Sequence, residues 1–308
     1  MKLFKKREKK VKEKKKWSFK KKFFVTISSL FVVGVASFLF IFYGPWAGFR
    51  NFWITSAMTT MSHQYLATWF YSDETIQEVL ESNSIIESGD ISNPDAIQFK
   101  QYTTTIYRNE YEKAVLQKDP GNDLYKLIEI TGPTYKGFLV VLYDPSKISI
   151  ATTAYLGKRG QDILTVSQRE NAIIAMNAGG FYDPDWNSNG ALPHGTVFSN
   201  GQVVSDYADA RMGGGFIGFT HENKLVLGNM SKSQAIATGY RDAVEFGPFL
   251  IINGKAMETV GNGGSGNAPR VAIAQRKDGV VLFLCIEGSL PGYSTGATMN
   301  DVIEILLR

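Results

Sequence analysis

Residues Thr196–Ser205 read TVFSNGQVVS, two short apolar runs on either side of the dipeptide Asn200-Gly201. Asn-Gly readily supplies the two positive φ angles of a type I′ turn, and β-prone runs flanking it are typical of a β-hairpin. Because a two-residue hairpin joins antiparallel neighbours, this stretch predicts an antiparallel sheet around it.

The same pattern recurs further along the chain, where Asn253-Gly254 and Asp278-Gly279 accompany other β-prone runs. At the C-terminus, Thr298 with Asp301 forms a capping box before an amphipathic helix. The sequence therefore predicts an α+β fold for residues 124–308, a largely antiparallel sheet with flanking helices. The expected strands are Leu124–Thr131, Gly137–Tyr143, Ile148–Ala154, Ala172–Met176, Thr196–Ser205, Val244–Ile252, Val271–Gln275 and Val280–Ile286.

Residues 44–123 lack this β pattern, and we interpret them as a helical stalk followed by a linker. Apolar residues recur at three- and four-residue steps between Pro45 and Asn83, and Thr75 with Glu78 predicts a capping box. The apolar stripe either packs on the main domain or lies against a membrane surface. Residues 84–122 are polar and weakly patterned, so we expect a linker with little regular structure there.

Residues Phe23–Tyr43 read FFVTISSLFVVGVASFLFIFY, twenty-one residues without a charge. A helix of that length covers about 30 Å, the thickness of a bilayer's hydrocarbon core. A buried core helix and a cleaved signal peptide are the alternatives. Because the apolar run exceeds a usual signal-peptide core and follows a dense group of cations, we favour an uncleaved transmembrane signal-anchor at residues 23–43.

Charge is segregated along the chain. Residues 1–22 contain twelve Lys and Arg7 against Glu8 and Glu13, a balance of +11, which leaves −7 for the remainder. The positive-inside rule makes residues 1–22 a cytoplasmic tail and places the C-terminal domain outside the cytoplasm, in a single-pass plasma-membrane protein. A basic tail on an acidic body does not indicate nucleic acid, and we expect no nucleic-acid partner.

Cys285 is the only cysteine, so the chain forms no intramolecular disulfide. It lies within the β-prone run Val280–Ile286, and we expect it to be a buried small hydrophobic residue. An exported, lysine-rich chain that avoids cysteine suggests a Gram-positive bacterium.

Motifs for familiar cofactors are missing or misplaced. Gly261–Gly266 (GNGGSG) formally matches the dinucleotide pattern GxGxxG, but another β run follows it instead of a helix, so we expect a flexible loop that covers a ligand. No Walker or HExxH motif occurs, and the histidines are His63, His194 and His221. We expect no cofactor, and a metal requirement stays open.

The segment Ala172–Asp183 reads AIIAMNAGGFYD, a predicted buried strand that leads into Asn177 and the pair Gly179-Gly180. Glycines at a strand end allow a sharp turn or a close approach of the backbone to a ligand. An ordinary tight turn and a ligand site are equally compatible with this segment alone.

Further motifs follow in a fixed order, and together they resemble the phosphodiester glycosidase family, which includes membrane-anchored bacterial relatives often labelled exopolysaccharide-biosynthesis proteins. The resemblance covers residues 124–308. The motifs are the Asn177–Asp183 segment, Leu192–Val197 (LPHGTV), Phe246–Gly254 (FGPFLIING), Ala268–Gln275 (APRVAIAQ), Asp278-Gly279, Ile286–Gly288 (IEG) and Gly296–Thr298 (GAT).

The resemblance implies hydrolysis of a sugar joined through its anomeric carbon to a phosphodiester. By the family pattern, Asn177, Gly179, Gly180, His194 and Arg270 are substrate-binding residues, with the Arg270 guanidinium on the phosphate. Glu287 and Asp183 are the catalytic candidates, and Glu245 is a further acid. The alternatives are an ion pair for Arg270, a strand-end charge for Glu287 and a turn residue for His194.

Two departures from the family pattern matter. Ser289 stands where the family commonly has arginine, and the signature Asp-Gly-Gly-Ser stretch expected after the last helix does not occur before Arg308. We therefore expect a C-terminally incomplete domain.

The sequence thus predicts a membrane-anchored extracytoplasmic hydrolase that acts on glycosyl phosphodiesters of a cell-envelope polysaccharide or teichoic-acid-like polymer. A non-catalytic envelope-glycan-binding module, or a truncated inactive member, is the alternative. A membrane-anchored scaffold with a partner-recruiting stalk is a third.

Overall fold

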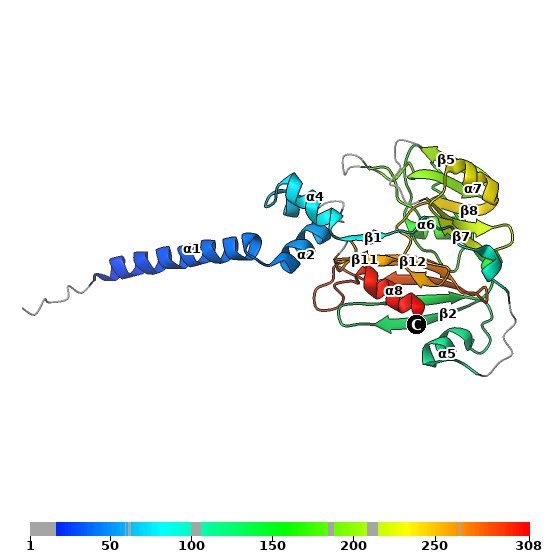
Figure 1. Ribbon diagram of the computed structural model, residues 1–308, viewed down its shortest axis with the longest axis horizontal. Helices are drawn as coiled ribbons and strands as arrows, with labels where there is room; N and C mark the ends of the chain where they lie inside the picture. The colour runs from blue at the N-terminus through cyan, green and yellow to red at the C-terminus, as the bar shows by residue number, and fades with distance from the viewer. Residues whose placement is uncertain are drawn as a thin grey trace, which may run out of the picture. The chain divides into compact units, whose positions relative to one another are not determined.

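The computed structural model describes residues 17–58, 60, 63–99, 106–183, 188–207, 215–264 and 266–308, and it divides into two compact units, Met1–Arg50 and Asn51–Arg308. The helices are α1 (Phe19–Tyr43), α2 (Ala47–Met58), α3 (Tyr65–Thr68), α4 (Asp73–Glu81), α5 (Glu110–Leu116), α6 (Ile163–Arg169), α7 (Lys232–Thr238) and α8 (Met299–Leu307), with 3₁₀ turns at Pro94–Ala96 and Pro145–Lys147 (Figure 1).

The strands are β1 (Ser84–Ile86), β2 (Tyr125–Thr131), β3 (Lys136–Leu142), β4 (Gly195–Ser199), β5 (Gln202–Tyr207), β6 (Phe216–Thr220), β7 (Leu225–Gly228), β8 (Tyr240–Glu245), β9 (Ile251–Ile252), β10 (Lys255–Ala256), β11 (Glu258–Val260), β12 (Arg270–Gln275) and β13 (Val281–Ile286).

In the first unit, the apolar run forms α1, which is long and apolar enough to cross a membrane, with a mean hydropathy of 2.4 and no buried residues. The helix begins four residues before the predicted span, because Ser18 caps it and Lys20 to Lys22 form its first turn. The cationic residues 1–16 lie outside the described residues.

The second unit contains two antiparallel sheets. One has the strand order β12-β13-β3-β2 and the other the order β5-β4-β8-β6-β7, while β1 pairs with β11 and β9 with β10. Every pairing is antiparallel. The predicted α+β fold with antiparallel sheets and flanking helices is confirmed.

Successive side chains along a strand point to opposite faces of its sheet, and both faces of each sheet are covered, so the second unit has four layers. Leu282, Leu284 and Ile286 of β13 pack with Val302 and Ile305 of α8 on one face of the first sheet. Residues of the opposite parity, among them Val281 and Phe283, pack with residues of β6 and β7 of the second sheet. A third cluster covers the far face of that sheet with Ala235 of α7. The order is therefore helix, sheet, sheet, helix, and the inner faces of the two sheets are in contact around Phe219, Leu225 and Val281.

The predicted turns are hairpins. Asn200 and Gly201 have φ values of 52° and 74°, and Asn253 and Gly254 have 52° and 77°, as a type I′ turn requires. At the β12–β13 turn only Gly279 has a positive φ, 93°. The Asp278 carboxylate instead accepts the Val280 N–H at 3.2 Å and pairs with Arg276.

Two predicted helix caps have different outcomes. Thr298 and Asp301 form the capping box of α8, as predicted. Ahead of α4, however, the cap is Ser72, whose hydroxyl accepts the Thr75 N–H at 3.3 Å. The Thr75–Glu78 prediction was therefore wrong by one helical turn.

Two predicted strands do not form, and a third, Val244–Ile252, is divided between the end of β8 and the two-residue β9. Ile148–Ala154 is irregular, because its backbone bonds to side chains: the Ile150 N–H donates to Asp242 at 3.2 Å and the Ile150 carbonyl accepts from Ser199 at 2.9 Å. Ala172–Met176 pairs with no strand in the described structure, and Ile173 is 72% exposed.

Cys285 is exposed instead of buried. It alternates with Leu284 and Ile286, which face the core under α8, so its side chain projects from the other face of β13. Partial burial and the nearby Glu287 charge raise the pKa of its thiol.

Residues 84–98, predicted to be an unstructured linker, form what we call the strap. It begins with β1 on β11, then pairs Ile91 with Gly228 of β7, and the Ser92 N–H donates to Leu227 at 2.8 Å. It ends beyond the 3₁₀ turn, where the Gln98 N–H donates to the Lys277 carbonyl in the β12–β13 turn at 2.7 Å. The strap therefore joins both sheets, and the prediction of little structure was wrong.

The glycine-rich loop is held by the helical region instead of lying free over a ligand. The Asn262 N–H donates to Asn83 at 3.0 Å, and its amide donates to the buried Thr55 hydroxyl at 2.7 Å. A Cβ at Gly261 would lie 2.2 Å from the Asn83 side-chain oxygen. Ser265 lies outside the described residues.

Candidate active site

The first group of motifs meets where two short segments pair. Phe181 and Pro193 form an antiparallel bridge, flanked by hydrogen bonds from Tyr182 to the Leu192 carbonyl (2.8 Å) and from the His194 N–H to the Gly180 carbonyl (2.9 Å). The Asn177–Asp183 segment and the Leu192–Val197 segment are thereby joined, and His194 is placed beside the glycine pair.

The two predicted glycines have different surroundings. A Cβ at Gly180 would lie 2.7 Å from the His194 ring, whereas a Cβ at Gly179 would meet Val244 at 3.5 Å, an ordinary contact. Only Gly180 is therefore required sterically, because a side chain there would displace the imidazole.

Glu245 lies at the same place. Its carboxylate accepts the Thr196 N–H at 3.1 Å, and a Cβ at Gly195 would lie 2.4 Å from it. Gly195 has a positive φ of 57°, so glycine suits both the conformation and the space. The Glu245 carboxylate, at the end of β8, thus contacts Thr196, which is two residues after His194. Sequence spacing could not reveal this proximity.

Asp183 has a local structural partner. Its carboxylate accepts the Ser188 N–H at 2.7 Å. The catalytic role of Asp183 stays a prediction.

The second group of motifs meets at one end of the β12–β13 hairpin. Arg270 is opposite Ile286 in the ladder, so Arg270 and Glu287 lie at the same end of these strands. Ala268 bridges to Ala297, and Cβ atoms at Gly288 or Gly296 would lie 2.5 Å and 2.4 Å from the Ala268–Pro269 backbone. The close packing explains the glycines of these motifs.

Arg270 is anchored by backbone carbonyls. Its Nε donates to Ala297 at 3.1 Å and one terminal nitrogen donates to Gly266 at 2.7 Å. Burial lowers the pKa of the guanidinium, which still leaves it charged at neutral pH. These contacts fix the orientation of a cation at the edge of the cavity described below.

Glu287 is partly buried, and its Oε2 atom has no hydrogen-bond partner in the described part of the chain. The nearby Glu287 carboxylate raises the pKa of Tyr293. Tyr293 also stacks on Lys136, whose Nζ lies 4.4 Å from the ring centre. No sequence pattern indicated Tyr293, because it stands in a loop outside every motif.

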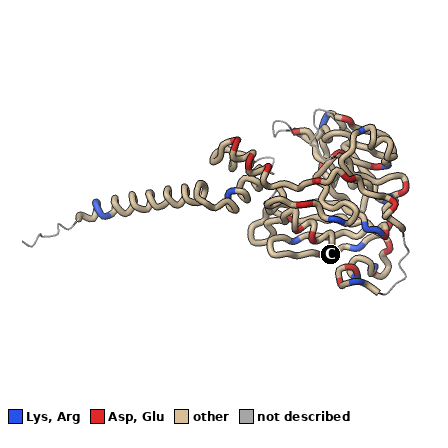
Figure 2. The backbone as a smooth tube through the Cα atoms, in the orientation of Figure 1, with Lys and Arg blue, Asp and Glu red and all other residues tan. Residues whose placement is uncertain are grey.

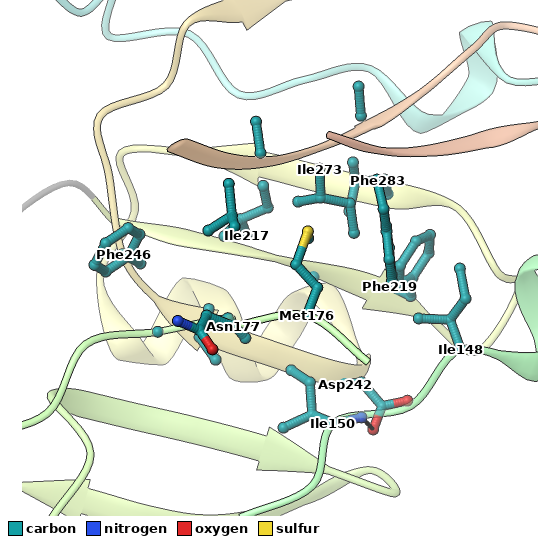
Figure 3. Close-up of a pocket in the computed structure, with 18 of the residues that line it drawn as sticks. Ile148, Ile150, Met176, Asn177, Ile217, Phe219, Asp242, Phe246, Ile273 and Phe283 are labelled. Atoms are coloured by element: carbon teal, nitrogen blue, oxygen red, sulfur yellow. Dashed lines mark hydrogen bonds between the residues drawn. The ribbon is translucent and has the colours of Figure 1, made fainter. Parts of the chain in front are cut away.

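A cavity of about 2310 Å³ opens between the inner faces of the two sheets. In the close-up of Figure 3, Met176 points into the space between Ile217 of one sheet and Ile273 of the other. Asp242 also lines it, but this carboxylate is 1% exposed, bonds to Ile150 and pairs with Arg241 at 2.6 Å, so we regard it as structural.

Most of the predicted site residues line this cavity. They are Asn177, Gly179, Gly180, Asp183, His194 and Arg270, whereas Glu287 does not line it and lies at the same end of the β12–β13 hairpin as Arg270. Across the described ranges, no group of three or more His, Cys, Asp or Glu side chains is arranged to hold a metal ion.

Comparison with known proteins gives one family. The model of the phosphodiester glycosidase family matches residues 170–308. Among curated proteins, the SPbeta prophage-derived uncharacterized protein YomE of Bacillus subtilis (strain 168) is 29% identical over 174 residues, 54% of this chain and 26% of that protein. The chain thus spans about a quarter of that relative's length.

Among solved structures, the catalytic domain of zebrafish N-acetylglucosamine-1-phosphodiester alpha-N-acetylglucosaminidase, auto-inhibited by its pro-peptide, has a TM-score of 0.47 at 17% identity, over 62% of this chain and 69% of that chain. The family match covers the site built above, from the Asn177 segment to α8. Residues 170–308 therefore match the phosphodiester glycosidase family, the family that the ordered motifs of the sequence resemble.

Proposed function

We propose that this protein is a membrane-anchored extracytoplasmic phosphodiester glycosidase that acts on glycosyl phosphodiesters of a cell-envelope polysaccharide or teichoic-acid-like polymer. The observation that carries the proposal is the family match over residues 170–308, which supports a glycosidase-type function. The meeting of its motifs around one cavity agrees with it.

In the proposed reaction, water adds to the anomeric carbon and the bond from that carbon to the phosphate oxygen breaks. The products are a free sugar and a phosphate monoester. The phosphate leaves with the electron pair, so a fixed cation beside it stabilises the transition state. We assign that role to Arg270, whose carbonyl contacts hold its guanidinium in place.

A carboxylate must take the proton that the attacking water loses. We assign this to Glu287 or Asp183. Glu287 has the buried Oε2 without a partner in the described structure, and it lies at the same end of the β12–β13 hairpin as Arg270. Asn177, the backbone of the Gly179-Gly180 turn and His194, which also line the cavity, would bind the sugar.

The location is also part of the proposal. α1 has the length and composition of a membrane span, and the +11 charge of residues 1–22 favours a cytoplasmic tail. The cavity-bearing unit would then stand outside the cytoplasm, where envelope polymers are the phosphodiester-linked glycans within reach.

The test uses the full chain in detergent and a panel of synthetic glycosyl phosphodiesters that differ in the sugar. Release of free sugar supports the enzyme. Arg270→Ala should raise KM or abolish turnover, whereas Arg159→Ala, a matched control outside the cavity lining, should not. Normal turnover by Arg270→Ala would remove Arg270 from the mechanism.

The same experiment separates the rival functions. Binding of an envelope glycan without sugar release would support the glycan-binding module. If His194→Ala loses that affinity while His221→Ala keeps it, the binding site is the cavity, because His221 does not line it. Neither binding nor turnover would favour the scaffold.

A further inference from the structure

An exposed pair of aromatic rings stands on the short helix α3. Trp69 is 72% exposed and Tyr65 is 40% exposed, and their ring centres are 4.8 Å apart. Other residues of the same region are well packed: Ala67 is 0% exposed, and the Trp53 indole N–H donates to the Leu66 carbonyl at 2.8 Å. The two rings therefore project from a firmly placed support.

The chain that leads to these rings carries no charge, and the acidic residues begin at Asp73. From Asn51 to Ser72 the sequence has no Lys, Arg, Asp or Glu, and from Phe23 to Ser72 the only such residue is Arg50. Elsewhere in the second unit, Asp, Glu, Lys and Arg are spread over α4 and both sheets (Figure 2). An uncharged run next to exposed rings is unusual for a surface that faces water.

The rings are also tethered close to α1. Tyr65 follows the last residue of α1 by twenty-two positions, twelve of which form α2. A helix rises about 1.5 Å per residue and an extended chain about 3.5 Å, so the rings stay within roughly 50 Å of the end of α1. Such a tether makes contact with the same bilayer an intramolecular event, favoured by a high effective concentration.

We propose that Tyr65 and Trp69 form a second membrane contact, inserted among the lipid headgroups of the bilayer that holds α1. This inference rests on the membrane anchor of the proposed function. Tyr and Trp favour this interface, because the ring is apolar while the hydroxyl or indole N–H bonds to water and headgroups. The contact orients the cavity-bearing unit and keeps it at the membrane surface.

The test is quenching of Trp69 emission in the full chain, reconstituted in vesicles of phosphatidylcholine and phosphatidylglycerol with brominated acyl chains. Subtracting the emission of Trp69→Phe isolates this residue. We expect loss of most of that emission with bromines placed near the headgroups and a smaller loss with bromines near the bilayer centre. As the matched control, Tyr155→Trp in the Trp69→Phe chain, a ring with 42% exposure on a charged loop, should not be quenched.

Carbonate extraction of the same vesicles tests the anchor separately. If the chain stays in the membrane but the bromines do not quench Trp69, the inference fails while the anchor survives. If aqueous acrylamide and bromolipid both fail to quench Trp69, another protein surface such as a second copy covers it, and the inference also fails. If carbonate releases the chain, both the membrane anchor and the membrane contact of Tyr65 and Trp69 are refuted.

Discussion

Gly180→Ala should disturb the site, whereas Gly179→Ala, one residue earlier, should not. A Cβ at Gly180 would lie 2.7 Å from the His194 ring, and ordinary contacts begin at 3.4 Å, so the ring must move by roughly 0.7 Å. Displacements approaching 1 Å at a catalytic site can cost about a hundredfold in rate, so we expect kcat/KM to fall roughly tenfold to a hundredfold. A Cβ at Gly179 meets Val244 at 3.5 Å, and we expect it to leave kcat/KM within about twofold.

The assay is sugar release from a glycosyl phosphodiester, with thermal unfolding of both variants as a check on folding. Nuclear magnetic resonance of the histidine rings gives a second readout that does not need turnover, because only Gly180→Ala should shift the His194 signals. Equal rates for the two variants, together with unchanged His194 signals, would refute the packing described here.

Three further predictions concern other parts of the structure. Glu287→Gln should lower the pKa of Cys285, because the Glu287 carboxylate disfavours the thiolate. The Cys285 thiol of this variant should then react faster with maleimide at a given pH. An unchanged rate would mean that the two groups do not interact. Burial raises the pKa of Tyr143 to about 12, above its usual 10. The neutral phenol therefore contributes fully to the free energy of unfolding below pH 10, and this contribution is lost as the pH rises through 12. Denaturant titrations of Tyr143→Phe should show a smaller alkaline loss of stability. A chain that starts at Leu124 lacks the strap and should melt at a lower temperature than one that starts at Asn51, and equal melting would show that the strap adds no stability.

Features that depend on neighbouring residues could be predicted from the sequence. Asn200-Gly201 and Asn253-Gly254 determine their turns through their own backbone preferences, and Thr298 caps the helix that it begins. These local signals were enough for the antiparallel fold class. The ordered motifs then indicated the family, since their residue types identify a chemistry without any knowledge of distances.

Features that depend on distant partners could not be predicted. Ala172–Met176 has the composition of a strand, but a strand also needs a paired neighbour, which composition does not report. The strap was missed for the opposite reason, because its polar sequence is fixed by backbone bonds to residues such as Leu227 and Lys277 far along the chain. The predicted domain bounds at 44, 124 and 308 stay predictions.

The contact of Glu245 with Thr196, two residues after His194, shows the same limit within the site. The two residues are far apart in sequence, and only the pairing of β4 with β8 brings them together. Spacing along the chain therefore favoured Asp183, which stands in the same motif as Asn177.

The strap has a mechanical consequence for a protein held at one end by lipid. Tension that arises when a polymer drags on the folded unit would travel along the backbone into residues 84–98 before it reaches either sheet. The β1–β11 pairs, the Ser92–Leu227 bonds and the Gln98–Lys277 bond would yield one after another, while the sheets behind them stay intact. The strap would thus yield before the sheets, and the part of the cavity lined by Ser92, Asn93, Ala96 and Ile97 would open first under load.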